Sequence, residues 1–207
     1  MLSITLILIV ITAFISWRAF ENAALKERMM HSPYLVKHER QYHRLLSHAL
    51  IHSDWMHLAF NMFVLWSFGQ HVEHFFTEEH GNAGRITYLL LYALAALAAT
   101  LPSMRKHGNN PDYRSVGASG AVSAVMVAAM FISPDSRISF FFLPGVPAYI
   151  AIVLFFVLEH VLSRTGRTNI AHDAHIWGAL FGIAFMGLLE PEVIANFFSY
   201  VKSQLMG

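Results

Sequence analysis

The sequence predicts an all-α membrane protein in which six transmembrane helices form a single domain over residues 1–207. The chain is 56% hydrophobic and only 13% charged, whereas a soluble domain carries roughly 25% charged residues. Six windows lack Asp, Glu, Lys and Arg, and each is near the roughly 20 residues that cross a bilayer core. This composition excludes an ordinary soluble enzyme and a disordered chain. The six windows are 1–17, 55–72, 86–104, 115–134, 138–158 and 174–189.

The other totals narrow the function. The formal net charge is +1 with thirteen histidines counted as neutral, which gives no electrostatic basis for binding nucleic acid. The chain has no cysteine, so disulfides, thiolate metal sites and cysteine nucleophiles are absent. No motif indicates a cofactor, and the oligomeric state cannot be read from these totals.

The first span, residues 1–20, is predicted to be retained. It lacks the basic leading region of a signal peptide, and no small-residue cleavage site precedes Trp17 and Arg18. The segment from Arg18 to Asp54 then mixes charged residues with apolar and aromatic ones. This mixture is typical of a structure that lies in the membrane interface, so we expect an interfacial first loop in contact with lipid.

The remaining spans are expected at 52–72, 86–104, 115–133, 147–162 and 174–189. Polar connections are predicted at 73–85 and 105–114. Pro144, Gly145 and Pro147 interrupt the fifth window, so its helix is expected to begin near Pro147. A short amphipathic tail, 190–207, follows Pro191.

The serine of Gly117-Ala118-Ser119-Gly120 stands at the start of the fourth window. Flanking glycines let its backbone approach another helix or a substrate, and a helix start offers free N–H groups to an oxyanion. Helix packing explains the motif equally well, since Gly120, Ala124 and Ala128 form the small-residue stripe that membrane helices use for close contact.

A second polar residue lies in the sixth window. His175, Gly178 and Gly182 fall at i, i+3 and i+7 and share one helical face. The glycines allow a close approach to the stripe below Ser119, which would bring imidazole and hydroxyl together as a base and a nucleophile. A lone histidine in a membrane helix is more often a structural hydrogen-bond partner, but its pairing with the serine motif favours catalysis.

A third pattern is His48-x3-His52-x4-His57-x3-Asn61. His57 and Asn61 share a helical face and, with the Ser119 N–H, can hold the oxygen of a tetrahedral intermediate. A metal site is the competing interpretation, because His71 and His74 lie further on, but HExxH and carboxylates at ligand spacing are absent from this window. A structural role for His48 and His52 in the preceding loop is favoured over both.

No carboxylate is expected to orient His175. Asp173 lies on the opposite side of any helix that contains both residues, and Asp54 and Glu159 lie outside the charge-free windows, near span ends. The sequence therefore predicts a Ser–His dyad and not a triad.

At these residues the chain resembles the rhomboid family of intramembrane serine proteases, of the bacterial six-span type. The family pattern combines H-x3-H-x4-H-x3-N in the second span, G-x-S-G in the fourth and A-H-x-x-G-x-x-x-G in the sixth, and all three occur here in order. The resemblance extends to Arg44 in the first loop and to Trp66-x2-Gly69-x3-Glu73. It departs from the family at His43, where tryptophan is frequent, and at Ser123, where many bacterial members have a tyrosine that stacks on the catalytic histidine.

The resemblance implies a serine-type endopeptidase that cleaves transmembrane segments of other membrane proteins. It implies Ser119 as nucleophile, His175 as general base, and His57 and Asn61 as the remainder of the oxyanion hole, in a polar cavity lined by His52, His57, Asn61 and His175. The supporting residues are Gly117, Gly120, His52, Gly178, Gly182 and Arg44.

Three alternatives stay open: an inactive rhomboid-like protein that binds transmembrane helices, a small transporter, and a metal-dependent protease that uses the histidine cluster. The expected location is a cell membrane, the bacterial inner membrane by resemblance. Orientation is contested, because eleven of the fourteen Lys and Arg residues lie in the connections after spans one, three and five. The positive-inside rule places those connections in the cytoplasm, whereas the resemblance places them outside.

Overall fold

The computed structural model describes residues 3–139, 145–165 and 171–206, and the architecture is almost entirely helical. Pro144 and positions 140–143 of the fifth window lie outside these ranges. The long helices are α1 (Ile4–Glu21), α5 (Trp55–His80), α6 (Asn82–Ala98), α8 (Ser119–Ile132), α9 (Ala148–Thr165), α10 (His172–Leu189) and α11 (Pro191–Met206). The short elements are α2 (Ala23–Met29), α3 (Pro33–Glu39), α4 (Arg44–Ser47), the 3₁₀ helix η1 (His48–Leu50), α7 (Leu101–His107), β1 (Arg137–Ile138) and β2 (Val146–Pro147).

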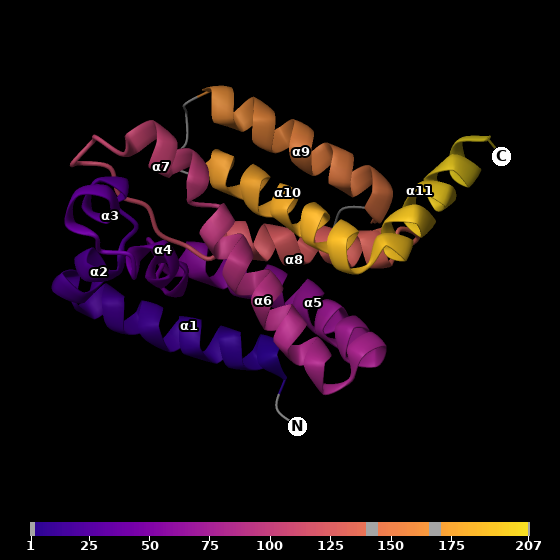
Figure 1. The fold of residues 1–207 in the computed structure, drawn as a ribbon, viewed down its shortest axis with the longest axis horizontal. Coiled ribbons are helices and arrows are strands. Elements are labelled where there is room, and N and C mark those ends of the chain that lie inside the picture. Colours follow the sequence, from indigo (N-terminus) through magenta and orange to yellow (C-terminus); the bar gives the residue numbers. More distant parts are fainter. Residues whose placement is uncertain (1–2, 140–144, 166–170, 207) are drawn as a thin grey trace.

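Helix α8 forms the centre of the bundle. It packs against α5, α6 and α10, while α1 runs along one side and α9 covers α10 on the other (Figure 1). Every residue from Gly120 to Phe131 is buried. These are mostly Ala, Val, Met and Gly, so the helix is narrow enough for three neighbours to approach it. The residues that follow Ser119 are therefore the most enclosed part of the core.

Each of the six predicted spans overlaps one long helix, and the prediction of an all-α membrane bundle is confirmed. Length and apolarity are sufficient for a membrane crossing in Ile4–Glu21 and in Asn82–His107 among the described residues. Helices α10 and α11 satisfy the same criterion only as a pair, bent by 110°. Helix α8 is apolar but shorter. By this criterion the described chain contains two or three clear spans.

Several helix ends differ from the boundaries of the predicted spans. Helix α5 continues past residue 72 to His80, because the polar stretch after Val72 contains no helix breaker before Gly81, whose φ is +59°. The predicted connection 73–85 is therefore mostly helical. The predicted span 86–104 lies within Asn82–His107, which is long and apolar enough to cross a membrane, although α6 ends at Ala98 and α7 begins at Leu101 with Pro102 in its first turn. The expected start near Pro147 is confirmed: α9 begins at Ala148, after an antiparallel pairing of β1 with β2.

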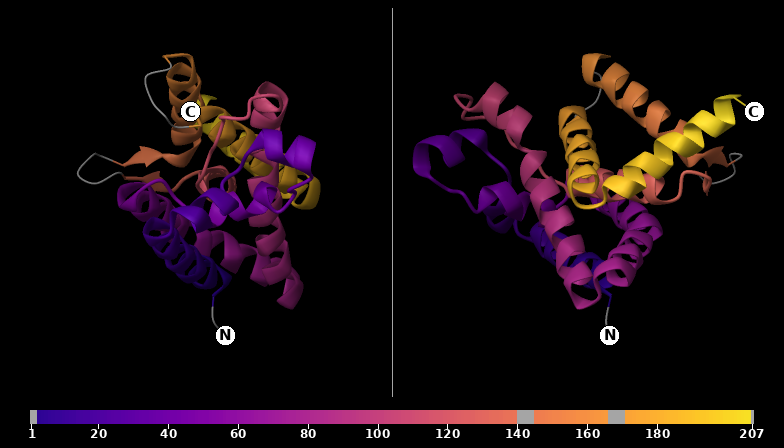
Figure 2. Two further views of the ribbon diagram at one scale, coloured as in Figure 1. Left: turned by 90° about the vertical axis from the view of Figure 1, so that its left-hand side faces the viewer. Right: turned by 45° about the vertical axis from the view of Figure 1, so that its right-hand side comes forward.

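The first loop is a compact helical unit that comprises α2, α3, α4 and η1. Arg44, 5% exposed, donates from Nη1 to the carbonyl oxygens of Glu27 at 2.6 Å and Met30 at 2.8 Å. Its Nε donates to Gln41 at 2.6 Å. A guanidinium can satisfy several carbonyls at fixed angles in this way, so Arg44 holds the turns of the loop together. Figure 1 and the right-hand view of Figure 2 show this unit at one end of the bundle.

Candidate active site

The segment before Ser119 is fixed by the first loop. Ser115 and His31 exchange backbone hydrogen bonds, and the Gly117 N–H donates to the His48 carbonyl at 2.9 Å. Gly117 has a φ of +120°, and a Cβ there would lie 2.8 Å from His57 Cε1. Both the backbone conformation and the missing side chain therefore require glycine. The chain then turns directly into α8 with Ser119 as its first residue.

Helices α8 and α10 touch through their glycines. A side chain on Gly178 would overlap the Gly120 carbonyl oxygen, and a Cβ on Gly182 would lie 2.7 Å from the carbonyl oxygen of Ala124. This confirms the close approach that the spacing of His175, Gly178 and Gly182 predicted. It also confirms the packing role of the small-residue stripe on α8, so the packing and functional interpretations of these glycines are compatible.

Ser119 and His175 lie at the same end of α8 and α10, next to the first of the glycine contacts between these helices. A Cβ on Gly120 would lie 3.1 Å from the carbonyl oxygen of Ala174, so the backbones are adjacent at the residues next to the pair. No hydrogen bond joins Ser119 to His175 in the described part of the chain. The imidazole of His57 is close enough to His175 to interact with it electrostatically. The structure thus brings Ser119, His57 and His175 to one region.

His57 and Asn61 lie on the first two turns of α5. Asp54 caps this helix by accepting from the His57 N–H at 2.9 Å. Ser53 Oγ lies 2.9 Å from His57 Nδ1 and 2.6 Å from Asp54 Oδ2. Because the hydroxyl has one proton, its choice between these acceptors sets the His57 tautomer. Asn61, 3% exposed, donates to the His57 carbonyl at 3.0 Å.

His52 links the serine segment to α1. Ser16 Oγ donates to the Leu50 carbonyl at 3.1 Å and lies 2.9 Å from His52 Nδ1, which therefore carries the proton. His52 Nε2 then accepts from the Ala118 N–H at 3.5 Å. His48 contributes its backbone carbonyl to the same segment. These contacts agree with the structural role favoured for both residues.

A carboxylate does reach His175, contrary to the prediction. Glu159 Oε1 lies 3.0 Å from His175 Nδ1, and Glu159 Oε2 lies 2.7 Å from His172 Nδ1. The prediction was wrong because α9 extends to Thr165, which places Glu159 inside a helix beside α10. The sequence offers no local signal for this pairing, since Glu159 belongs to a different helix from its partners.

Glu159, His172 and His175 also form the one grouping of three potential metal ligands within the described ranges, with donor atoms within 4.8 Å of one another. This grouping lies on α9 and α10 and shares no residue with the histidine cluster of the first loop and α5 that was considered for a metal. His52 and His57 instead contact Ser16, Ala118 and Ser53. The potential metal ligands in the structure are therefore different residues from the histidines that the sequence spacing suggested.

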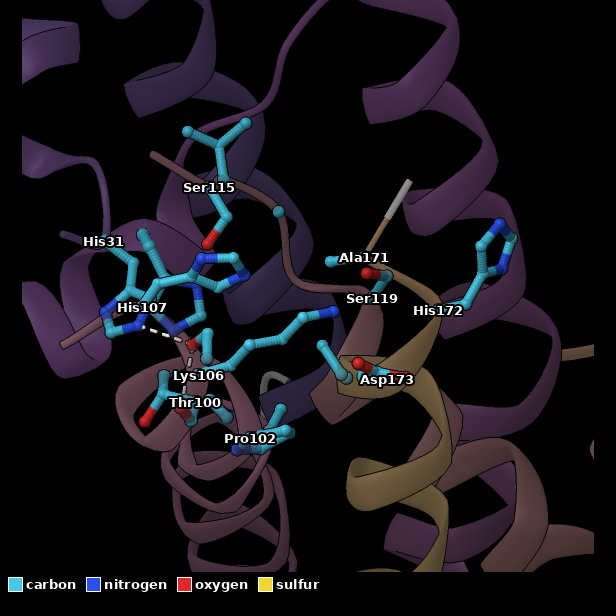
Figure 3. Close-up of a pocket in the computed structure, with 18 of the residues that line it drawn as sticks. His31, Thr100, Pro102, Lys106, His107, Ser115, Ser119, Ala171, His172 and Asp173 are labelled. Atoms are coloured by element: carbon cyan, nitrogen blue, oxygen red, sulfur yellow. Dashed lines mark hydrogen bonds between the residues drawn. The ribbon is translucent and has the colours of Figure 1, made fainter. Parts of the chain in front are cut away.

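A polar cavity of about 200 Å³ opens beside Ser119, but its walls differ from the prediction. The expected lining residues His52, His57, Asn61 and His175 do not contribute to it. Figure 3 shows Ser119 at its edge, with the Lys106 side chain extending toward it and the His172 ring turned away. The cavity lies between the first loop, α7 and the start of α10. Its polar lining includes Thr100, Lys106, His107, Tyr113, Ser119 and Asp173.

His31 and His48 form the loop side of this cavity. Their rings lie 5.5 Å apart, and both side chains are buried. Burial lowers the pKa of His31 to about 3 and that of His48 to about 4. Both imidazoles are therefore neutral at pH 7, which adds polarity but no charge to this wall.

The fold and the site define a helical membrane protein with a serine at a helix start, a histidine on the adjoining helix and a histidine-asparagine pair opposite. A model of the Rhomboid domain matches residues 39–191, and the chain belongs to the rhomboid family. With its apolar helices, this makes it an integral membrane protein.

Known relatives come from organelles and from bacteria. RHOMBOID-like protein 12, mitochondrial, of Arabidopsis thaliana is 30% identical over 180 residues, 80% of this chain and 52% of the relative. Presenilin-associated rhomboid-like protein, mitochondrial, of Bos taurus is 29% identical over 145 residues, 69% of this chain and 37% of the relative. Rhomboid protease GluP of Bacillus subtilis is 29% identical over 145 residues, 70% of this chain and 26% of the relative. The chain thus spans about half or less of their lengths, and the bacterial subtype stays a prediction.

Proposed function

We propose that this protein is an intramembrane serine endopeptidase that cleaves transmembrane segments of other membrane proteins, with Ser119 as nucleophile and His175 as general base. The principal support is the glycine contact between α8 and α10, which sets the two residues at the same end of adjoining helices. Membership in a family that includes a protein named as a protease also supports it. Catalytic hydrogen bonds are often long in free enzymes and shorten with substrate bound.

The chemistry follows from these positions. Ser119 Oγ attacks the carbonyl carbon of the scissile bond, its proton passes to His175 Nε2, and the carbonyl π electrons move to oxygen. The C–N bond then breaks, and the imidazolium gives its proton to the departing amine. Water hydrolyses the acyl-enzyme with His175 as base again. The polar cavity beside Ser119 is a route for that water.

The oxyanion hole is proposed to comprise the Ser119 N–H and the side chains of His57 and Asn61. The first N–H groups of a helix have no partner within it, so the Ser119 N–H is available. Donation from His57 Nε2 requires the tautomer in which Ser53 donates to His57 Nδ1. Removing one such donor costs on the order of 10²–10³ in rate in other serine proteases.

Substrate choice follows from backbone chemistry. A transmembrane helix has its peptide groups paired, and a protease needs an extended strand. We therefore infer that substrates contain helix-weakening residues such as Gly or Pro near the membrane face. The six-span topology and the bacterial inner membrane are part of this proposal, supported by the six long helices that overlap the predicted spans and by the bacterial relative.

The test uses purified protein in liposomes with a fluorescent transmembrane substrate. Ser119→Ala and His175→Ala should each lower the cleavage rate by about 10³-fold or more, and the double variant should lose little further, because the two residues act as a unit. Ser67→Ala is the matched control, since Ser67 is exposed and its hydroxyl donates to the Phe63 carbonyl of its own helix. Circular dichroism checks that every variant is folded.

Two other outcomes would favour the alternatives. Cleavage by Ser119→Ala that a chelator abolishes would indicate a metal-dependent protease. If the wild-type protein binds transmembrane peptides, cleaves none of them and does not react at Ser119 with a fluorophosphonate probe, the inactive, helix-binding alternative would be correct.

A further inference from the structure

Glu159 connects α9 to the catalytic end of α10. Its two carboxylate oxygens each face one imidazole, with Oε2 2.7 Å from His172 Nδ1 and Oε1 3.0 Å from His175 Nδ1. The three side chains are well enclosed, with 12% of Glu159, 5% of His172 and 15% of His175 exposed. His172 and His175 are one turn apart on α10, so one carboxylate spans both rings.

A carboxylate at this depth requires strong partners. Moving an ionised carboxyl group out of water is costly unless donors replace the lost hydration, and carboxylates within membrane helices are rare and usually functional. Two imidazole N–H groups at these distances supply that replacement. The arrangement is therefore a charge-assisted pair of hydrogen bonds.

This contact fixes the protonation pattern of His175. An ionised carboxylate only accepts hydrogen bonds, so the proton of the neutral imidazole lies on Nδ1. Nε2 then holds the lone pair, as a general base for Ser119 requires. The carboxylate also stabilises the imidazolium that forms when the serine proton is taken. One group thus performs both tasks of the acidic member of a catalytic triad.

The contact also accounts for the residue at position 123. The resemblance leads to the expectation of a tyrosine there to orient the catalytic imidazole, and this chain has a buried serine. A bond from Nδ1 to Glu159 restricts rotation of the same ring. The missing aromatic contact is therefore compensated by a carboxylate on a different helix.

We propose that Glu159 is the positioning residue of the Ser119–His175 pair, which makes the site a Ser–His–Glu triad, and that His172 holds the carboxylate in place. This inference rests on the proposed function. His172 acts indirectly, through its bond to Glu159, because its ring is turned away from the cavity beside Ser119 (Figure 3).

The experiment compares Glu159→Gln and Glu159→Asp in liposomes. The glutamine variant keeps the size of the side chain but loses its charge, and its amide no longer fixes the His175 tautomer. Its kcat should fall by up to about 10⁴-fold, the loss seen when a buried triad aspartate is changed to asparagine, with KM within about threefold. The kcat of Glu159→Asp should be at least tenfold higher than that of Glu159→Gln. Glu192→Gln, on exposed α11, is the matched control and should equal the wild type.

Labelling of Ser119 by a fluorophosphonate gives a readout that is independent of substrate entry. The labelling rate should fall in parallel with kcat in Glu159→Gln and should fall less in His172→Leu, while melting temperatures stay within a few degrees of the wild type. A merely structural ion pair would lower the melting temperature and leave the labelling rate of the folded fraction unchanged, which would overturn the proposal.

Failure of this inference is distinct from failure of the proposed function. If wild-type protein cleaves and is labelled, Ser119→Ala is inactive, and Glu159→Gln retains wild-type kcat and labelling, then only the triad is wrong. If Ser119→Ala cleaves normally, the proposed function itself fails. Stoichiometric zinc in the purified protein, lost in Glu159→Gln and His172→Leu, would instead assign the three residues to a metal site and overturn the proposal.

Discussion

At the residue scale, Gly178 has no space for even a methyl group where α10 crosses α8. We expect Gly178→Ala to lower both the melting temperature and the cleavage rate, because a methyl group there meets the backbone of Gly120 rather than a side chain that can move. Overpacking of this kind costs about 1–3 kcal/mol. The measurement is thermal unfolding in detergent alongside the cleavage assay.

Gly187→Ala is the control on the same helix. A Cβ there would make only an ordinary contact, 3.9 Å from Ile194 Cγ1, and alanine favours helix over glycine by up to about 1 kcal/mol. This variant should be as stable as the wild type or slightly more so. Equal stability of Gly178→Ala and Gly187→Ala would contradict the close packing of α8 and α10.

How far the site could be predicted also depends on individual residues. The spacing of His175, Gly178 and Gly182 was sufficient to predict a glycine face, because residues on one helix keep fixed relative positions. Glu159 was missed, because its position beside His175 depends on how two helices pack and on where α9 ends. The spacing of residues along the chain gives neither the packing of the two helices nor the end of α9.

At the scale of elements, the first loop should make the protein sensitive to acid. Burial lowers the pKa of His31 to about 3 and that of His48 to about 4, against 6.5 for a free imidazole. In the unfolded chain both residues therefore take up protons below about pH 6.5, while the folded protein excludes them. Stability is fully present above that pH and falls as pH decreases toward 4, by about 2 kcal/mol per histidine at pH 5.

Melting temperatures measured between pH 7.5 and 4.5 test whether stability falls as pH decreases. His31→Gln and His48→Gln should each flatten the decline, because each removes one group that binds a proton only after unfolding. His38→Gln, in the same loop but exposed, should leave the slope unchanged. An identical decline in all four proteins would show that these two histidines are not the cause.

Elements were predicted well where composition decides them. The charge-free windows located the cores of six of the seven long helices, all but α11, since apolar length is visible in the sequence. Helix ends were predicted less well, because the charges after Val72 are compatible with a helix that extends to Gly81, and the break after Ala98 has no glycine to mark it. The helices of the first loop depend on Arg44 and its carbonyl partners, which are distant in sequence.

At the scale of the whole molecule, membrane orientation can be tested directly. The positive-inside rule and the resemblance disagree about which side holds the connections after spans one, three and five. We expect the family orientation, with the cavity beside Ser119 open to the outside, because many of the positive charges belong to the folded first loop and serve its packing, as Arg44 does.

The chain has no native cysteine, so single cysteines at Asn110 and Asn82 can be labelled in intact cells with an impermeant maleimide. Both positions are exposed. Asn82 begins α6 and Asn110 follows α7, so the two positions lie at opposite ends of the span Asn82–His107. Labelling at Asn110 alone is the expected result. Labelling at Asn82 alone would show that the protein has the opposite orientation.

Glu73 has a consequence for how the chain enters the bilayer during synthesis. Its carboxylate accepts from the backbone N–H groups of Ile4 at 2.7 Å and Thr5 at 2.9 Å, and from the Ser3 hydroxyl at 2.6 Å. The N-terminal end of α1 is thus completed by a residue that the ribosome adds almost seventy positions later. Until then, these donors are satisfied only in water or inside the translocon, because lipid offers no acceptor. We therefore expect α1 to be released into lipid together with α5, as an antiparallel pair, and not on its own.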